Sequence, residues 1–348
     1  ISIEAGTVRV GDGNFSGNLG SGAIANNGAL AFNRADAVTV ANAISGAGTV
    51  TKQGSGVLTL SGASTYTGNT FVNAGTLSTL NNTALGATNG STTVSSGATL
   101  DVNARNLGAE PVLVSGTGDV GGGAIINSGA QSLNALRYVT LLGNTTVGGA
   151  GRWDIRAAPS TTDPSLAGLS TGGNAYKLTK IGANQVSLVG VTVDPALGDV
   201  EVQAGILGIE TATTGLGNPA NSLTVAAGAS LQFFNLTNQL NKVILLTSDG
   251  LTPSIINNSG ANTVVGPITL TTDCIFNVNG TSLNVAGNLS GGLLTKQGTG
   301  NLIISGNATH AGIVANVGAV TLNGTQSGGM TNTSTFATFA GSGTNNGF

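Results

Sequence analysis

A glycine-punctuated phrase constrains the fold of this chain more than any other feature. Residues 44–77 read as three short strands, Thr49–Lys52, Val57–Leu60 and Thr70–Asn73, with glycines between them. Glycine adopts tight and left-handed turns without steric cost, and a helix cannot accommodate interruptions this frequent. The phrase therefore predicts short strands joined by sharp corners.

The same phrase returns further along the chain. Residues 288–322 repeat it closely, with His310 in place of Tyr66, and residues 177–207 repeat it in degenerate form. Repetition on this scale is typical of solenoids, in which each coil of about 20 residues stacks on the next. We therefore expect residues 1–348 to form one continuous body.

Composition favours the same architecture. Charged residues make up 7% of the chain, aromatic residues 4% and hydrophobic residues 40%, and Gly accounts for 57 of 348 positions. So little charge argues against disorder, and so few aromatic rings indicate a narrow core of small aliphatic layers. The sequence predicts an all-β, parallel β-helix (β-solenoid) with glycine-rich turns and essentially no helix.

The repeated phrase resembles the passenger-associated transport repeat, also called the autotransporter-associated β-strand repeat, of bacterial surface proteins. Its pattern is Thr-Lys-x-Gly-x-Gly-x-Leu-x-Leu-x-Gly, then Thr-Tyr-x-Gly and Ala-Gly-Thr-Leu. Residues 44–77 match it fully, residues 288–322 well and residues 177–207 in outline. The resemblance implies a right-handed β-helix displayed at a bacterial cell surface or outside the cell. It brings no catalytic residues with it.

Charge and hydropathy limit the partners. A net charge of −3 gives no attraction to nucleic acid or to an anionic membrane. No apolar run approaches the roughly 20 residues of a membrane span, and residues 1–10 lack the features of a signal peptide. We expect an exported chain whose signal and anchor are not present in this sequence.

Three lysines, Lys52, Lys180 and Lys296, recur at one position of the repeat. They read either as a row of ligand-binding cations or as solvated strand-edge lysines that discourage lateral pairing, and the sequence favours the second reading. The single cysteine, Cys274, has strand-like neighbours and is expected to be a buried structural thiol.

Residues 149–176 are the least regular segment, and we predict that they form a projecting loop. They contain the only tryptophan, Trp153, between Arg152 and Asp154, with Arg156 two residues further on. Such a cluster suits stacking and hydrogen bonding to a sugar or to a neighbouring subunit. The alternative is a tryptophan that fills the base of its own loop. These four residues are the candidate binding site.

Signals of catalysis or metal binding are weak. Residues 168–172 match Gly-x-Ser-x-Gly, but no helix is expected after them, and the sole histidine, His310, is explained by its place in a repeat. The densest acidic group, Asp194, Asp199 and Glu201, reads as solvated turn carboxylates before it reads as a Ca²⁺ site. The sequence predicts no catalytic residue, no metal site and no cofactor.

Taken together, these features predict a non-enzymatic extracellular structural protein of a bacterial surface. It would form a rod, or a head-to-tail fibre through its terminal coils, with an adhesive, stalk or biofilm-matrix role. One alternative is an adhesin module that binds a host or matrix glycan or protein through residues 149–176. A more distant one is a polysaccharide-active β-helix enzyme, which needs convergent carboxylates such as Asp154 and Asp163.

Overall fold

The computed structural model describes residues 1–158 and 167–346, which form parallel β-strands and one 3₁₀ turn, η1 (Asp119–Gly121), with no α-helix among them. These residues fall into two compact units, each described here by itself. Unit 1 contains residues 1–158, 167–172 and 181–186, and unit 2 contains residues 173–180 and 187–346.

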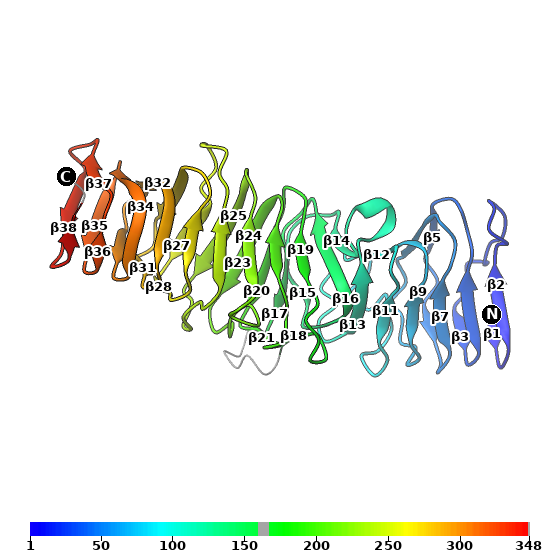
Figure 1. Cartoon of the computed structure of the whole chain (residues 1–348). Helices are drawn as coiled ribbons and strands as arrows, with labels where there is room; N and C mark the ends of the chain where they lie inside the picture. The colour runs from blue at the N-terminus through cyan, green and yellow to red at the C-terminus, as the bar shows by residue number, and fades with distance from the viewer. Residues whose placement is uncertain (159–166, 347–348) are drawn as a thin grey trace. The chain divides into compact units, whose positions relative to one another are not determined.

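In unit 1, strands of successive coils stack in parallel columns, which are drawn in blue to green in Figure 1. One long column contains β2 (Thr7–Val10), β4 (Ala29–Phe32), β7 (Thr49–Lys52), β9 (Thr70–Val72), β11 (Thr92–Val94), β13 (Pro111–Gly116), β16 (Tyr138–Gly149) and β18 (Gly168–Ser170). A second contains β5 (Val38–Val40), β8 (Val57–Leu60), β10 (Gly75–Thr79), β12 (Ala98–Asp101) and β14 (Ile125–Asn127). Shorter stacks contain β1 (Ser2–Ile3), β3 (Ile24–Asn26) and β6 (Ile44–Ser45), and β15 (Ser132–Leu136) with β17 (Trp153–Arg156).

Unit 2 is built in the same way. Its first column contains β19 (Leu178–Lys180), β22 (Val200–Val202), β24 (Ser222–Val225), β26 (Val243–Leu246), β29 (Ile268–Leu270), β32 (Leu289–Gln297), β34 (Asn307–Ala315), β36 (Thr325–Gln326) and β39 (Thr344–Asn345). Its second contains β23 (Gly205–Glu210), β25 (Ala229–Phe234), β27 (Ile255–Ser259), β30 (Cys274–Val278) and β37 (Gly329–Asn332), with the later parts of β32 and β34 between the last two. Its third contains β28 (Ala261–Val264), β31 (Ser282–Val285), β33 (Asn301–Ile304), β35 (Gly318–Leu322) and β38 (Ala337–Ala340). The remaining strands are β21 (Thr192–Val193) in unit 2 and β20 (Gln185–Val189), of which residues 185–186 belong to unit 1 and residues 187–189 to unit 2.

The register of the coils builds the core. Leu58 pairs with Leu77 and Leu77 pairs with Leu100, so one aliphatic side chain lies directly above the next. All three are at most 2% exposed. Burying a leucine side chain stabilises a fold by about 1.5–3 kcal/mol, and every coil contributes several such residues. The narrow aliphatic core inferred from composition is present.

The prediction of an all-β, parallel β-solenoid is confirmed, whereas its right-handedness and its single continuous body stay predictions. In the predicted loop 149–176, the structure places residues 153–156 in β17 and residues 168–170 in β18. Residues 159–166, which include both prolines of the segment, lie outside the described residues. The described part of the segment is therefore more regular than its sequence indicates.

Candidate functional site

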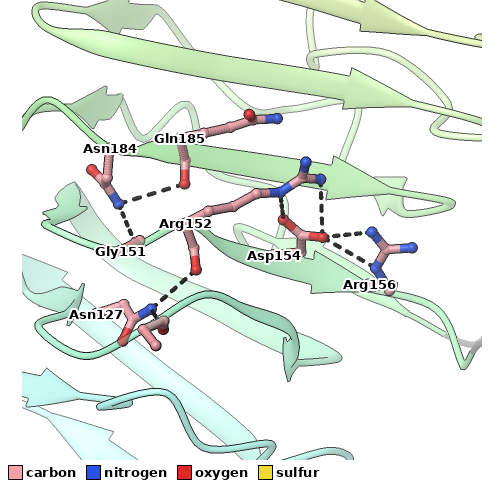
Figure 2. Close-up of polar contacts among 8 residues, drawn as sticks. Asn127, Gly151, Arg152, Asp154, Arg156, Asn184 and Gln185 are labelled. Atoms are coloured by element: carbon pink, nitrogen blue, oxygen red, sulfur yellow. Dashed lines mark hydrogen bonds and ion pairs between the residues drawn. The ribbon is translucent and has the colours of Figure 1, made fainter.

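The four predicted binding residues lie in strand β17 and at the position just before it, Arg152. Side chains alternate between the two faces of a strand, so Arg152, Asp154 and Arg156 share one face. Arg152 donates from Nε to Asp154 Oδ1 at 2.9 Å, and Arg156 donates from Nη2 to Asp154 Oδ2 at 2.6 Å. Figure 2 shows the carboxylate held between the two guanidinium groups. The three charged residues that the sequence analysis grouped together therefore contact one another in the structure.

Burial differs sharply within this cluster. The Asp154 side chain is 0% exposed, while those of Arg152 and Arg156 are 24% and 23% exposed. A buried carboxylate is tolerated when charged donors satisfy it, and here two arginines do so. Two guanidinium groups contact this one carboxylate, and both remain partly exposed. The exposed guanidinium atoms can donate hydrogen bonds to an anion or to a hydroxyl oxygen.

Trp153 lies on the opposite face of β17 and is completely buried. Its indole Nε1 donates to the carbonyl oxygen of Gly148 at 2.8 Å. The ring therefore packs in the core, where no surface ligand reaches it, and stacking of Trp153 on a sugar does not fit this position. Of the predicted site, only the two arginines offer exposed atoms.

Two asparagines fix the backbone that leads into this strand. Asn127 donates from Nδ2 to the carbonyl oxygen of Arg152 at 3.0 Å, and Asn184 donates to that of Gly151 at 2.9 Å (Figure 2). Both asparagine side chains are at least nine-tenths buried. The Arg152 carbonyl also accepts a hydrogen bond from Ser132 N at 2.9 Å, so the buried amides add bonds that hold this corner in place.

Both interpretations of the repeat lysines made from the sequence are wrong. Lys52, Lys180 and Lys296 are at most 1% exposed, so they are neither solvated edge residues nor a row of surface cations. Lys52 follows Val50 on the inward face of β7, and its Nζ donates to the carbonyl oxygens of Gly54 and, at 3.0 Å, Ala74. The lysine thus ties its own corner to the corner of the next coil.

The other two copies use the same geometry. Lys296 Nζ donates to the carbonyl oxygens of Gly298 at 2.6 Å and Val317 at 2.8 Å, and Lys180 Nζ donates to that of Ala204 at 3.0 Å. Burial lowers the pKa of each of these ammonium groups to about 8. A neutral amine still has two N–H groups, enough for the two carbonyls of one corner.

A fourth buried lysine, Lys242, was missed because it stands outside the repeat. Its Nζ donates to the carbonyl oxygens of Gly198 and Asn218, both at 2.9 Å, and burial lowers its pKa to about 8. Glu110 was also missed. It is 3% exposed, accepts a hydrogen bond from Thr92 Oγ1 at 2.8 Å, and burial raises its pKa to about 7. In sequence, both look like ordinary polar turn residues.

The remaining chemical candidates have structural roles in the fold. Cys274 is buried as predicted, and burial raises the pKa of its thiol. His310 is 2% exposed, and its Nε2 lies 3.1 Å from Gln326 Oε1. Ser170 of the Gly-x-Ser-x-Gly segment lies at the end of β18, where its hydroxyl oxygen accepts a hydrogen bond from Gly172 N at 3.1 Å.

The acidic group of unit 2 is divided among separate partners. Asp199 accepts from Ser222 N at 2.8 Å, and Glu201 pairs with Lys177 at 3.0 Å. Among residues 1–158 and 167–346, no three His, Cys, Asp or Glu residues gather in a way that could hold a metal ion. Nor do these residues contain a helix with the length and hydropathy of a membrane span.

The fold and its corner lysines define the class: a parallel β-solenoid built from a recurring strand–corner unit. Residues 50–79 and 294–324 match the family model of the passenger-associated-transport-repeat. These two segments, one in each unit, are therefore similar to that repeat, and the match does not extend to the rest of the chain. No curated protein and no solved structure matches the chain significantly.

Proposed function

We propose that this chain is a non-enzymatic structural segment of a bacterial surface protein, which holds adhesive or matrix-forming parts away from the cell. The observation that carries the proposal is the presence of two transport repeats in a parallel solenoid that buries four lysines against backbone carbonyls. The buried lysines and the doubly paired aspartate stabilise coils by bonding to backbone carbonyls and to arginines. Structural passengers need such self-contained coils, whereas enzymes need convergent reactive groups.

Surface exposure in the native bacterium tests this proposal. An epitope inserted after Leu251, which is 83% exposed, should be accessible to antibody and removed by protease on intact cells. The same tag placed beside the buried Leu283 is the matched control and should disrupt the fold. A correctly folded chain protected from protease until the cells are lysed would contradict the proposal.

Two companion measurements address its finer parts. Incubation with a panel of polysaccharides should release no reducing ends and no unsaturated products; sustained release would identify an enzyme. Negative-stain electron microscopy over a concentration series tests the predicted self-assembly. Filaments that lengthen with concentration support a fibre, and isolated particles at every concentration support a displayed passenger.

A second candidate function is recognition of an acidic host or matrix ligand by Arg152 and Arg156. The supporting observation is the pair of partly exposed guanidinium groups on one face of the strand. Arg156→Gln should abolish binding to a sulfated glycan, while Arg9→Gln, which removes the same charge from an exposed strand position, should not. Equal loss in the two variants would indicate nonspecific attraction by net charge.

A further inference from the structure

A polar hollow of about 490 Å³ opens on unit 1, away from the arginine pair. It lies between the segment that follows β2 and the corner that joins β4 to β5. Its lining residues are Phe15, Gly17, Asn18, Arg34, Asp36, Ala37, Val38 and Thr39. No functional role described so far uses any of them.

The loop on one side of this hollow is fixed to the opposite side. Gly13 N donates to Asn33 O at 2.9 Å, and Ala35 N donates to Asn14 O at 3.1 Å. Arg34 Nη1 also donates to the carbonyl oxygen of Gly17. These bonds join the loop to the corner on both sides of residue 15, so the walls are held before any ligand arrives.

Phe15 stands at the centre of that fixed loop with 73% of its surface exposed. Exposing a phenylalanine costs the free energy that its burial would provide, about 1.5–3 kcal/mol. Here the loop presents the ring beside polar groups instead of turning it into the core. An exposed aromatic face next to convergent polar atoms is a common arrangement of ligand sites.

The floor of the hollow is a rigid donor–acceptor pair. Arg34 donates from Nε to Asp36 Oδ1 at 2.8 Å and from Nη2 to Asp36 Oδ2 at 2.7 Å. This bidentate contact fixes both side chains in one plane. The pair lowers the pKa of Asp36, which stays ionised as an acceptor. Asn18 and Thr39 add further donors and acceptors at the edge.

We infer that this hollow binds a neutral pyranose oligosaccharide, with Phe15 against the apolar C–H face of one ring and the Arg34–Asp36 pair on its neighbouring hydroxyls. A pyranose has one apolar face and, around its edge, vicinal hydroxyls that both donate and accept, which matches the side chains present. Asp12 lies close enough to Arg34 to influence it electrostatically, so two carboxylates surround one guanidinium. That balance disfavours sulfated or uronic sugars and separates this site from the Arg152–Arg156 pair.

The test is saturation-transfer NMR and calorimetry on the full chain with defined probes at millimolar concentration: cello-, malto-, chito- and galacto-tetraose, and a sulfated disaccharide. At least one neutral probe should bind, and Phe15→Ala should weaken it about tenfold or more through loss of ring stacking. Phe336→Ala removes a phenylalanine of similar exposure, 79%, from unit 2 and should leave the affinity unchanged. Asp36→Asn should also weaken binding, with circular dichroism confirming the fold.

Three results would overturn the inference. They are no binding by any neutral probe, equal binding by the wild type and Phe15→Ala, and preferential binding of the sulfated probe with a steep salt dependence. Surface display of the chain does not enter this experiment. Failure here therefore leaves the proposed scaffold role standing, and failure of that role leaves the sugar site standing.

Discussion

Two repeats match the family model: residues 50–79 in unit 1 and residues 294–324 in unit 2. They share the same contacts at the corner lysine but differ at one buried interior position. Lys52 and Lys296 each take one carbonyl two residues ahead and one in the corner of the next coil. That corner continues with a left-handed glycine in both repeats. At this corner of the repeat, both copies satisfy the backbone carbonyls with the same lysine.

The interior position in the middle of the repeat is less constrained. Tyr66 donates to or accepts from Thr70 Oγ1 at 2.6 Å, whereas His310 contacts Gln326 3.1 Å away. Both are at most 2% exposed. A buried polar ring is acceptable here as long as one partner reaches it. His310 also accepts a hydrogen bond from Gly312 N at 3.3 Å, so the two repeats fill this interior position with different rings and different partners, whereas the corner keeps its lysine.

Replacing the corner lysine should have the largest effect, and an equal one in both repeats. Lys52→Met or Lys296→Met keeps the aliphatic length but leaves two buried carbonyls unpaired, which costs about 3 kcal/mol. Hydrogen exchange of β7–β10 or β32–β35 measures the loss. Lys177→Met, at an exposed position, is the control. A loss of stability about ten times smaller than expected would contradict the prediction, because it would mean that water bonds to the two carbonyls in place of the lysine.

The corner glycines should come next. Gly75 has φ +63°, and an added Cβ would lie 2.6 Å from Gly54 O; Gly318 has φ +77°, and its Cβ would lie 2.6 Å from Gly298 O. Alanine at either position should cost about 2 kcal/mol or more, from left-handed strain and the clash. Gly6 and Gly250 have similar φ values and open space around them, so alanine there should cost only the strain. Equal costs at crowded and open sites would exclude the clash. Hydrogen exchange again provides the readout.

The interior ring should matter less. Tyr66→Phe removes the hydroxyl that pairs with Thr70 and should cost about 1–2 kcal/mol, measured as reduced amide protection in β8–β10. Tyr138→Phe, at a half-buried position of the same unit, is the matched control. If amide protection is unchanged in Tyr66→Phe, the hydroxyl contributes no stability and the side chain acts only by filling space.

Mild acidification should give the smallest effects, with opposite signs at Glu110, which packs beside the first repeat, and at His310, which belongs to the second. Glu110, beside Tyr66 and Thr92, has a pKa raised to about 7, so its contribution to stability is lost as pH rises through 7 and regained below it. Burial lowers the pKa of His310, so the unfolded chain binds the proton first and stability falls as pH drops below about 6.5. Each change should be at most about 1 kcal/mol between pH 7 and 6. Amide protection factors measure it, and Glu110→Gln and His310→Gln should each abolish their own slope.

The sequence was sufficient for the fold because glycine corners and alternating aliphatics recur in register. For the lysines the prediction from sequence was wrong, because a charged side chain is normally exposed to solvent. The alternation itself held the right answer: Val50 points inward, so Lys52 does too, and Leu294 implies the same for Lys296. At these positions the alternation of the strand predicts the direction of the side chain better than the charge of the residue does.

The candidate site was predictable only in part. Spacing of two residues placed Arg152, Asp154 and Arg156 on one face, but the same rule puts Trp153 on the other face, toward the core. The hollow beside Phe15 carries no sequence signal, since it depends on backbone bonds between segments about twenty residues apart. Lys242 and Glu110 were hidden for the same reason: their partners lie in other coils.

The burial of two unique residues gives this molecule an intrinsic pair of spectroscopic and chemical reporters. Its one tryptophan, Trp153, belongs to unit 1, and its one cysteine, Cys274, belongs to unit 2. Indole emission responds when unit 1 opens, while the thiol, shielded and with a raised pKa, reacts with a labelling reagent only when unit 2 opens. Unfolding the unmodified chain while following both signals therefore shows whether the coils of the two units melt together or one unit at a time.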